Sequence, residues 1–244
     1  LFFTGYNLDM LKKSLRLILT KKLDSIILAG SHFVAPIEAD NACIAEAAEE
    51  VPVLLLNAAY DHPNVYSTLC DDHTAMYEAA AAMLRSGIHD ILYLYNTCSY
   101  SGMRKRKGIE DALREKSAAD LEAHLCFYSG PRDEPAEIAD FLERTADSGT
   151  LFGGVIASDD SLAVGAIKYA QRRGLRIPQD FSVIGCNNSF LAACCTPELT
   201  SVDNRLETLV RQLVHTMLHV LAGESMPKKS IFSGSLVRRE TTRF

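Results

Sequence analysis

The stretch SDDSLAVGAIKYAQRRGLRIPQDFSVIGCNN, residues 158–188, decides the fold class of this chain. It reads as one helix followed at once by one strand. Ser158 is placed to cap the first amides of the helix, and Asp159 and Asp160 put negative charge where the helix dipole favours it. Gly174 supplies a left-handed stop, and the apolar run FSVIGC then predicts a buried strand.

The same alternation of strand and helix runs along the whole chain. The predicted strands are Leu23–Leu28, Val51–Leu56, Asp90–Tyr95, Ala123–Tyr128, Leu151–Ala157 and Phe181–Cys186, with a further extended run at Val65–Cys70. The predicted helices are Leu8–Lys21, Ile37–Glu50, Asp72–Ser86, Ser101–Lys116, Pro135–Asp147, Ser158–Arg173 and Arg205–Ala222. Short apolar strands alternating with helices are typical of an α/β fold with doubly wound parallel sheets.

Composition excludes several classes of protein. The chain has 244 residues, 48% of them apolar, which suffices for a real core. No apolar run approaches the ~18–20 residues that a membrane helix requires. The net charge of −6 disfavours a stand-alone nucleic-acid binder. The seven cysteines form no C-x-x-C pair, so we expect free thiols and a cytoplasmic protein.

Polar side chains follow several of the predicted strands. Asn57, Ser99, Asp159 and Asn187 all stand at or shortly after a strand end. In open parallel sheets, ligands bind at the carboxyl ends of the strands, and amides and carboxylates suit a small polar ligand. Each position taken alone is also explained as a turn former or a helix cap. Their recurrence at several strand ends favours a binding site.

The last hundred residues resemble a known family. Ser158–Ile167, Gly174–Gly185, Pro197–Val202 and Leu236–Thr242 resemble, in order and spacing, the ligand-binding domain of the lac repressor (LacI/GalR) family. The resemblance implies a periplasmic-binding-protein-like fold of two lobes joined by three crossovers. It assigns residues 1–70 and 203–232 to one lobe, and residues 71–202 and 233–244 to the other.

The resemblance also implies a function. Family members are transcription regulators in which a helix-turn-helix domain precedes the sensor. Here that domain, and the first strand and helix of the sensor, have no counterpart. The chain is therefore expected to be an effector-binding and dimerisation module. It would bind a sugar-like or nucleoside-like metabolite between the lobes, form a homodimer, and reach operator DNA only through the helix-turn-helix domain.

The site residues carried over from the family differ from its usual pattern. Lys105 holds the place of a family arginine, and Asn57 and Asn187 hold the places of family aspartates. A lysine lacks the bidentate fork of arginine, so the effector stays open. The predicted effector-binding residues are Asn57, Asp72, Ser99, Tyr100, Arg104, Lys105, Asp159, Asp160 and Asn187.

The basic run Arg104–Lys107 has three interpretations; contact with DNA phosphates is disfavoured by the acidic net charge, and two others remain. It is either a solvated helix face or a hold for an anionic or hydroxyl-rich effector, since positive charge near a helix start opposes the helix dipole. His215 and His219 lie four residues apart, but no Glu follows the first of them as in a zinc hydrolase. This pattern favours a structural role over a metal site. We expect no cofactor, no metal and no catalytic residue.

Two alternatives remain open at this point. One is an exported solute-binding protein of a transporter, which shares the two-lobed fold. The other is an enzyme of Rossmann-like fold, although the sequence carries no P-loop and no dinucleotide-binding fingerprint.

Overall fold

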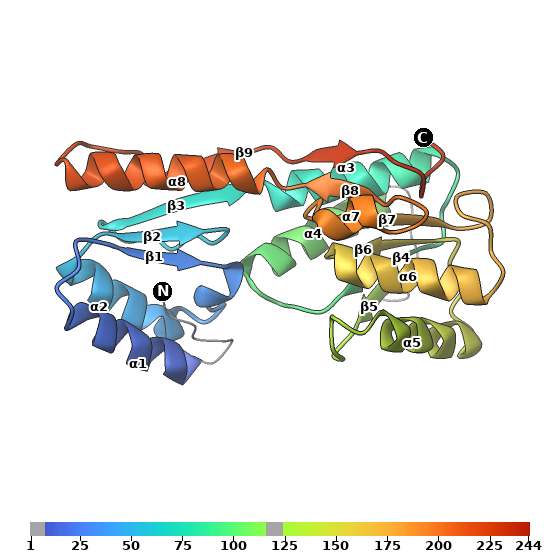
Figure 1. The fold of residues 1–244 in the computed structure, drawn as a ribbon, viewed down its shortest axis with the longest axis horizontal. Helices are drawn as coiled ribbons and strands as arrows, with labels where there is room; N and C mark the ends of the chain where they lie inside the picture. Colours follow the sequence, from blue (N-terminus) through green and yellow to red (C-terminus); the bar gives the residue numbers. More distant parts are fainter. Residues whose placement is uncertain (1–7, 116–123) are drawn as a thin grey trace. The chain divides into compact units, whose positions relative to one another are not determined.

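The computed structural model describes residues 8–115 and 124–244, and these form two compact α/β units (Figure 1). Unit 1 contains residues 8–70, 98–101 and 205–232. Unit 2 contains the described residues of 71–97, 102–204 and 233–244. Residues 98–101 were expected in the other lobe from the family resemblance, but they group with unit 1.

Unit 1 is a four-stranded parallel sheet in the order β1-β2-β3-β9. Its strands are β1 (Ile26–Ala29), β2 (Val53–Leu56), β3 (Val65–Cys70) and β9 (Lys229–Phe232). Its helices are α1 (Leu8–Leu19), α2 (Ala42–Glu50) and α8 (Leu206–Leu221), with short 3-10 turns at Ser31–Phe33 and Glu38–Asn41.

The strand residues of unit 1 alternate between two cores. Leu28, Val53 and Leu55 pack with α1 and α2. Leu54 and Leu56 point the other way and pack with α8. Figure 1 shows α1 and α2 on one side of this sheet and α8 on the other. This period-two alternation is what a sheet covered on both faces requires.

Unit 2 is a six-stranded sheet in the order β10-β8-β7-β6-β4-β5, in which only β10 is antiparallel to its neighbour. Its strands are β4 (Ile91–Tyr95), β5 (Leu125–Phe127), β6 (Gly154–Ala157), β7 (Ser182–Cys186), β8 (Thr200–Asp203) and β10 (Ser235–Val237). Its helices are α3 (Asp72–Arg85), α4 (Tyr100–Glu115), α5 (Pro135–Asp147), α6 (Asp160–Arg172) and α7 (Phe190–Cys194), although Tyr100 and Ser101 of α4 group with unit 1.

Two cores lie on the two faces of the second sheet. One joins Leu92, Val155 and Val183 to α5 and α6. The other joins Tyr93, Ile156 and Ile184 to α3 and α4. Phe181 of the first core and Tyr93 and Ile91 of the second are among the largest fully buried side chains of the described residues. Strands β4, β6 and β7 are buried along their whole length, because both faces of the sheet are covered there.

Most predicted elements are confirmed, with different boundaries. Helix α6 begins at Asp160, and its cap is Asp159, whose Oδ1 accepts a hydrogen bond from the Leu162 amide at 3.0 Å. The prediction that Ser158 caps this helix is therefore wrong. Helix α2 begins at Ala42 instead of Ile37, because the Asn41 side chain bonds the backbone of Ala35 and holds a tight turn.

Two further differences concern strands and the chain's short elements. Leu151 is 84% exposed, so the strand predicted from Leu151 begins only at Gly154. The sequence did not predict α7, β8, β9 or β10. Lys116 and Ala123, the ends of one predicted helix and one predicted strand, lie outside the described residues.

The packing of α5 against α6 depends on Gly165. A Cβ atom at this position would lie 2.3 Å from Ile138 Cγ2 and 2.5 Å from Ile138 Cβ, and Ile138 is fully buried. We expect Gly165→Ala to lower the free energy of unfolding by about 1–3 kcal/mol, because overpacking outweighs the ~1 kcal/mol that alanine gains in a helix. Urea unfolding would measure this.

The matched control is Gly153→Ala in the same unit. A Cβ atom there meets only Ile88 Cγ2, at an ordinary 3.8 Å. This change should alter stability by no more than about 0.5 kcal/mol. A Gly165→Ala protein as stable as the parent would show that α5 and α6 can move apart to accommodate the added methyl group without loss of stability.

Candidate functional site

The carboxyl ends of four adjacent strands of unit 2 carry one continuous set of polar side chains. Asn204 follows β8, Asn187 follows β7, Ser158 and Asp159 follow β6, and Asn96 follows β4. We call these five residues the strand-end cluster. Because parallel strands end at the same edge of a sheet, these residues are brought together although they lie far apart in the chain.

Lys105 of α4 joins the middle of the strand-end cluster. Its side chain is buried, and its Nζ donates to the backbone oxygen of Ser158 at 3.0 Å and to Asn187 Oδ1 at 3.4 Å. Asn204 Nδ2 donates to the same Asn187 oxygen at 3.1 Å. Two donors on Oδ1 define the orientation of the Asn187 amide, so its NH2 group is turned away from Lys105.

Asn187 is held in this position by its backbone. Its φ of 94° is in the left-handed region, which asparagine tolerates better than most residues. Its amide nitrogen donates to the Val202 carbonyl at 2.8 Å, which ties the end of β7 to β8. The residue itself is exposed, so its amide is accessible to a ligand.

The charge of Lys105 is kept despite its burial. Burial alone would lower the pKa of this ammonium group, but the neighbouring Cys186, Asp72 and Asp159 outweigh it and hold the pKa above its ordinary value. Burial raises the pKa of the Cys186 thiol to about 11, so Cys186 is protonated at neutral pH. The carboxylates are therefore the groups that keep Lys105 charged under physiological conditions.

Asp160 has a structural role within unit 2, and its role as an effector ligand stays a prediction. It is 2% exposed, its Oδ1 accepts from Ser201 Oγ at 2.6 Å, and its Oδ2 accepts from the Ser189 amide at 2.6 Å. Gly185 lies so close that a Cβ there would be 2.3 Å from Asp160 Oδ1. Both carboxylate oxygens thus serve to join α6 to β8 and to the loop after β7.

The basic run 104–107 is accounted for by local pairing. Arg104 Nη2 lies 3.1 Å from Asp71 Oδ1, Arg106 Nε lies 2.6 Å from Glu110, and Lys107 Nζ lies 2.6 Å from Asp111. Only Lys105 of the four enters the strand-end cluster. Three residues of the run are thus paired with neighbouring carboxylates, and the fourth, Lys105, is a buried cation. The run is therefore neither entirely a solvated helix face nor entirely a surface for binding an effector.

The remaining predicted residues divide between the units. Asp72 is buried at the start of α3 in unit 2, close enough to raise the pKa of Lys105. Asn57, Ser99 and Tyr100 belong to unit 1. Ser99 Oγ accepts from Ser31 Oγ at 2.9 Å, and Tyr100 packs against the core beneath α1 and α2.

Asn57 resembles Asn187 in its backbone. It follows β2 with a φ of 60°, and its amide donates to Thr68 O at 2.9 Å. Its Oδ1 is buried and has no hydrogen-bond partner within the described residues. An acceptor in this state favours a ligand role for Asn57 at the carboxyl edge of the first sheet.

Sequence reasoning missed three members of the strand-end cluster: Asn96, Ser158 and Asn204. Ser158 was interpreted only as a helix cap. Asn96 comes directly after the predicted strand Asp90–Tyr95, so the rule that selected Asn57 and Asn187 applied to it as well. Asn204 had no such signal, because the strand β8 that positions it was not predicted.

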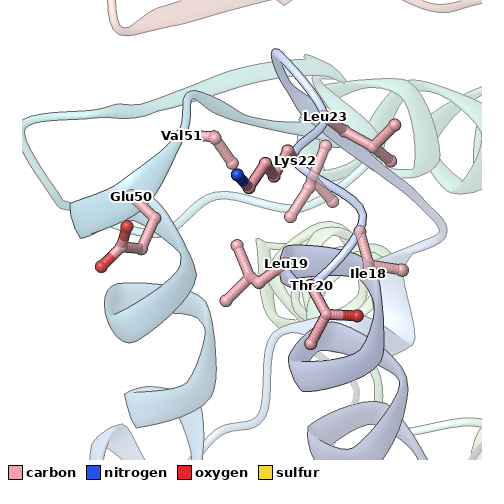
Figure 2. A pocket seen from close by; sticks show the side chains of 8 residues that line it. Ile18, Leu19, Thr20, Lys22, Leu23, Glu50 and Val51 are labelled. Atoms are coloured by element: carbon pink, nitrogen blue, oxygen red, sulfur yellow. The ribbon is translucent and has the colours of Figure 1, made fainter.

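Two hollows lie away from these residues. One, of about 410 Å³, is in unit 1 and is lined by the end of α1 and the end of α2. Figure 2 shows Ile18, Leu19 and Thr20 at its α1 side and Glu50 at its α2 side. The other, of about 420 Å³, lies beside Tyr128, Phe141 and Arg144 in unit 2. Neither contains a predicted effector residue.

The imidazole rings of His215 and His219 on α8 pack against each other. The ring centroids of His215 and His219 are 4.2 Å apart, and His219 Nδ1 lies 2.7 Å from Glu224 Oε2. Among residues 8–115 and 124–244, no three His, Cys, Asp or Glu side chains are grouped in a way that would hold a metal ion. Within the same residues, no helix has the length and apolar character to cross a bilayer.

Comparison with known proteins defines the class of domain to which this chain belongs. The family of periplasmic binding protein-like domains matches residues 80–242. A crystal structure of a sugar-binding LacI-family regulator from Escherichia coli, complexed with phosphate, superposes with a TM-score of 0.82 at 24% identity, over 96% of this chain and 82% of that one. This chain is thus a periplasmic-binding-protein-like ligand-binding domain.

The particular family follows from relatives of known class. An HTH-type transcriptional regulator of Lachnoclostridium phytofermentans is 42% identical over 99% of this chain and 72% of its own length. The HTH-type regulator AscG of Escherichia coli is 27% identical over 80% of this chain and 57% of its own length. The chain belongs to the LacI family of transcriptional regulators and corresponds to their effector-binding domain. An exported solute-binding protein is not favoured.

Substitution of Lys105 tests whether the contacts of the strand-end cluster also stabilise the fold. Lys105→Met removes the buried cation and leaves Asp72 and the Asn187 oxygen without it. We expect the free energy of unfolding to fall by about 3–5 kcal/mol, the usual cost of removing one member of a buried charged group.

Lys168 of α6 provides the matched control, because it is an exposed lysine in the same unit. Lys168→Met should change stability by no more than about 0.5 kcal/mol in the same urea titration. Equal stabilities of the two variants would mean that Lys105 contributes nothing to the fold.

Asp160 predicts a pH dependence of stability. Its burial, with a smaller contribution from Asp159, raises the pKa of the carboxyl group, although Ser201 and Ser189 partly oppose this. A raised folded-state pKa contributes stability that is present below the ordinary carboxyl pKa and is lost as the pH rises through the folded value. The advantage of the parent protein over Asp160→Asn should therefore shrink from about pH 4 to pH 7. A constant or growing difference in urea unfolding would contradict this.

Proposed function

We propose that this chain senses a small polar metabolite at the carboxyl edge of the second sheet and thereby controls DNA binding by a LacI-type repressor. The observation that supports the proposal most is that polar atoms of the strand-end cluster are buried without hydrogen-bond partners. Asn96 Oδ1, Ser158 Oγ and Asn204 Oδ1 are buried and have no hydrogen-bond partner within the described chain. Native proteins rarely leave such atoms unpaired, and a ligand's polar groups would satisfy them.

The chemistry of the cluster supports a polar effector. Its members offer amide, hydroxyl and carboxylate groups in fixed positions, which suit the hydroxyl groups of a sugar-like or nucleoside-like molecule. The solved LacI-family relative is described as sugar-binding, which supports the same class. A site of this kind binds without transforming its ligand, so we propose a sensor that is not an enzyme.

The regulatory output follows from differential affinity. An effector changes the balance between two conformations only by binding one more tightly than the other. A typical coupling of about 1–3 kcal/mol would change operator affinity about 5- to 150-fold. We propose a cytoplasmic homodimer whose DNA contacts are made by a helix-turn-helix segment outside these 244 residues.

The test is a thermal-shift screen of sugars, nucleosides and purines, followed by calorimetry of any ligand found. Asn204→Ala removes one orphaned acceptor and the donor to Asn187, so it should weaken binding at least about tenfold. Gln171→Ala, a surface amide on α6 that bonds only the Thr196 backbone, is the control and should bind as the parent does. Equal affinity of Asn204→Ala and the parent would reject this site.

A further inference from the structure

The loop that follows β7 has a strained backbone that requires several anchors. Asn187 and Asn188 have φ values of 94° and 45°, a left-handed conformation that costs free energy in residues other than glycine. Three successive amides, those of residues 187–189, donate to fixed acceptors: Val202 O at 2.8 Å, Ser201 Oγ at 3.0 Å and Asp160 Oδ2 at 2.6 Å. These bonds hold the backbone, and a further group holds the side chain of Asn188.

The guanidinium group of Arg239, two residues after β10, holds that side chain. Its Nη2 donates to Asn188 Oδ1 at 2.7 Å, and its Nη1 donates to Leu199 O at 2.7 Å. The side chain of Arg239 is only 17% exposed, and its backbone amide donates to Thr200 Oγ1 at 2.9 Å. One planar group, fixed at both ends of the residue, thus joins the loop after β7 to the start of β8.

We propose that Arg239 is a positioning residue for effector recognition, which presents the Asn187 amide by holding Asn188. The inference rests on the proposed function, since Asn187 belongs to the strand-end cluster. Lys105 and Asn204 occupy Asn187 Oδ1, so the NH2 group is the part of this amide that is presented to a ligand. Its direction depends on the loop backbone that Arg239 stabilises. Arg239 acts through Asn188, because Nη1 and Nη2 are both directed at protein acceptors.

The last segment of the chain has anchors of its own, apart from Arg239. Thr241 is fully buried, and its Oγ1 donates to Val183 O at 2.7 Å and accepts from the Thr200 amide at 2.9 Å. Thr242 Oγ1 lies 2.9 Å from Thr200 Oγ1. Loss of the Arg239 guanidinium should therefore release the loop after β7 while the last segment stays in place.

Hydrogen exchange on the unliganded protein tests the anchor. Arg239→Met keeps the length of the side chain but removes its donors. Exchange at the amides of residues 187–189 should become at least about tenfold faster relative to the amide of Ile156 in β6, which reports opening of the whole sheet. Arg239→Lys should give an intermediate rate, because lysine lacks the planar fork that reaches both acceptors. An unchanged ratio in Arg239→Met would overturn the proposal.

Calorimetry tests the link to recognition, and its probe is the tightest-binding sugar or nucleoside of the screen described above. Arg239→Met should bind this probe at least about tenfold more weakly, because the loop must then be ordered on binding. Arg243→Met is the matched control, since this exposed arginine of the same segment donates from Nε to Pro178 O at 2.9 Å and should leave the affinity unchanged. Equal affinity of Arg239→Met and the parent would refute the positioning role.

A double-mutant cycle tests whether Arg239 acts through Asn188. Asn188→Gly removes the acceptor, suits the left-handed backbone and leaves the bond from Arg239 to Leu199 O in place. This variant should weaken binding of the probe by itself, and the addition of Arg239→Met should weaken it no further. Two losses that multiply would mean that Arg239 acts independently of Asn188, contrary to the proposal.

The outcomes separate this inference from the proposed function. A probe that loses affinity in Asn204→Ala but keeps it in Arg239→Met overturns the inference and leaves the proposed site standing. A probe that binds Asn204→Ala as tightly as the parent, or a panel without any binder, overturns both.

Discussion

The second unit depends on one buried ammonium group. Lys105 extends from α4 and holds the ends of β6 and β7 together through the Ser158 carbonyl and the Asn187 amide. The nearby carboxylates of Asp72 and Asp159 favour the charged form of this buried group and hold its pKa above the ordinary value before any ligand arrives. The same contact turns the Asn187 amide so that its NH2 group is directed away from the lysine. Folding and the presentation of a binding surface are therefore coupled through one side chain.

Asp160 and Gly185 fix the position of the loop after β7 beneath this surface. The Asp160 carboxylate accepts bonds from Ser201 and from the loop after β7, and Gly185 provides the room that it occupies. The loop of Asn187 and Asn188 thus has fixed ends, and both residues have a left-handed backbone. Asn188 Oδ1 in turn accepts from Arg239 at 2.7 Å, which ties the loop to the last segment of the chain. A rigid loop favours recognition, because little ordering remains to be paid for on binding.

The elements with strong periodicity could be predicted from the sequence, and the short ones could not. Helix α5 was predicted at its observed bounds because Pro135 marks its start and apolar residues recur at helical spacing. Strands β9 and β10 have 4 and 3 residues and a half-exposed pattern, so nothing separates them from loop sequence. Residues 98–101 join unit 1 through the Ser31–Ser99 bond and the packing of Tyr100, which are tertiary contacts without a local signal.

The binding residues were predictable in type but not in role. Every polar residue after a strand looks alike in sequence, whether it is buried and satisfied like Asp160 or buried and orphaned like Asn204. Burial and partner count decide between the two, and both are properties of the packed chain. Asp159 shows the difficulty most clearly, since it caps α6 and also accepts from Asn96 Nδ2 at 3.3 Å. One carboxylate thereby serves a helix end and the polar cluster at once. A residue in such a double position limits how far the site can change without loss of stability.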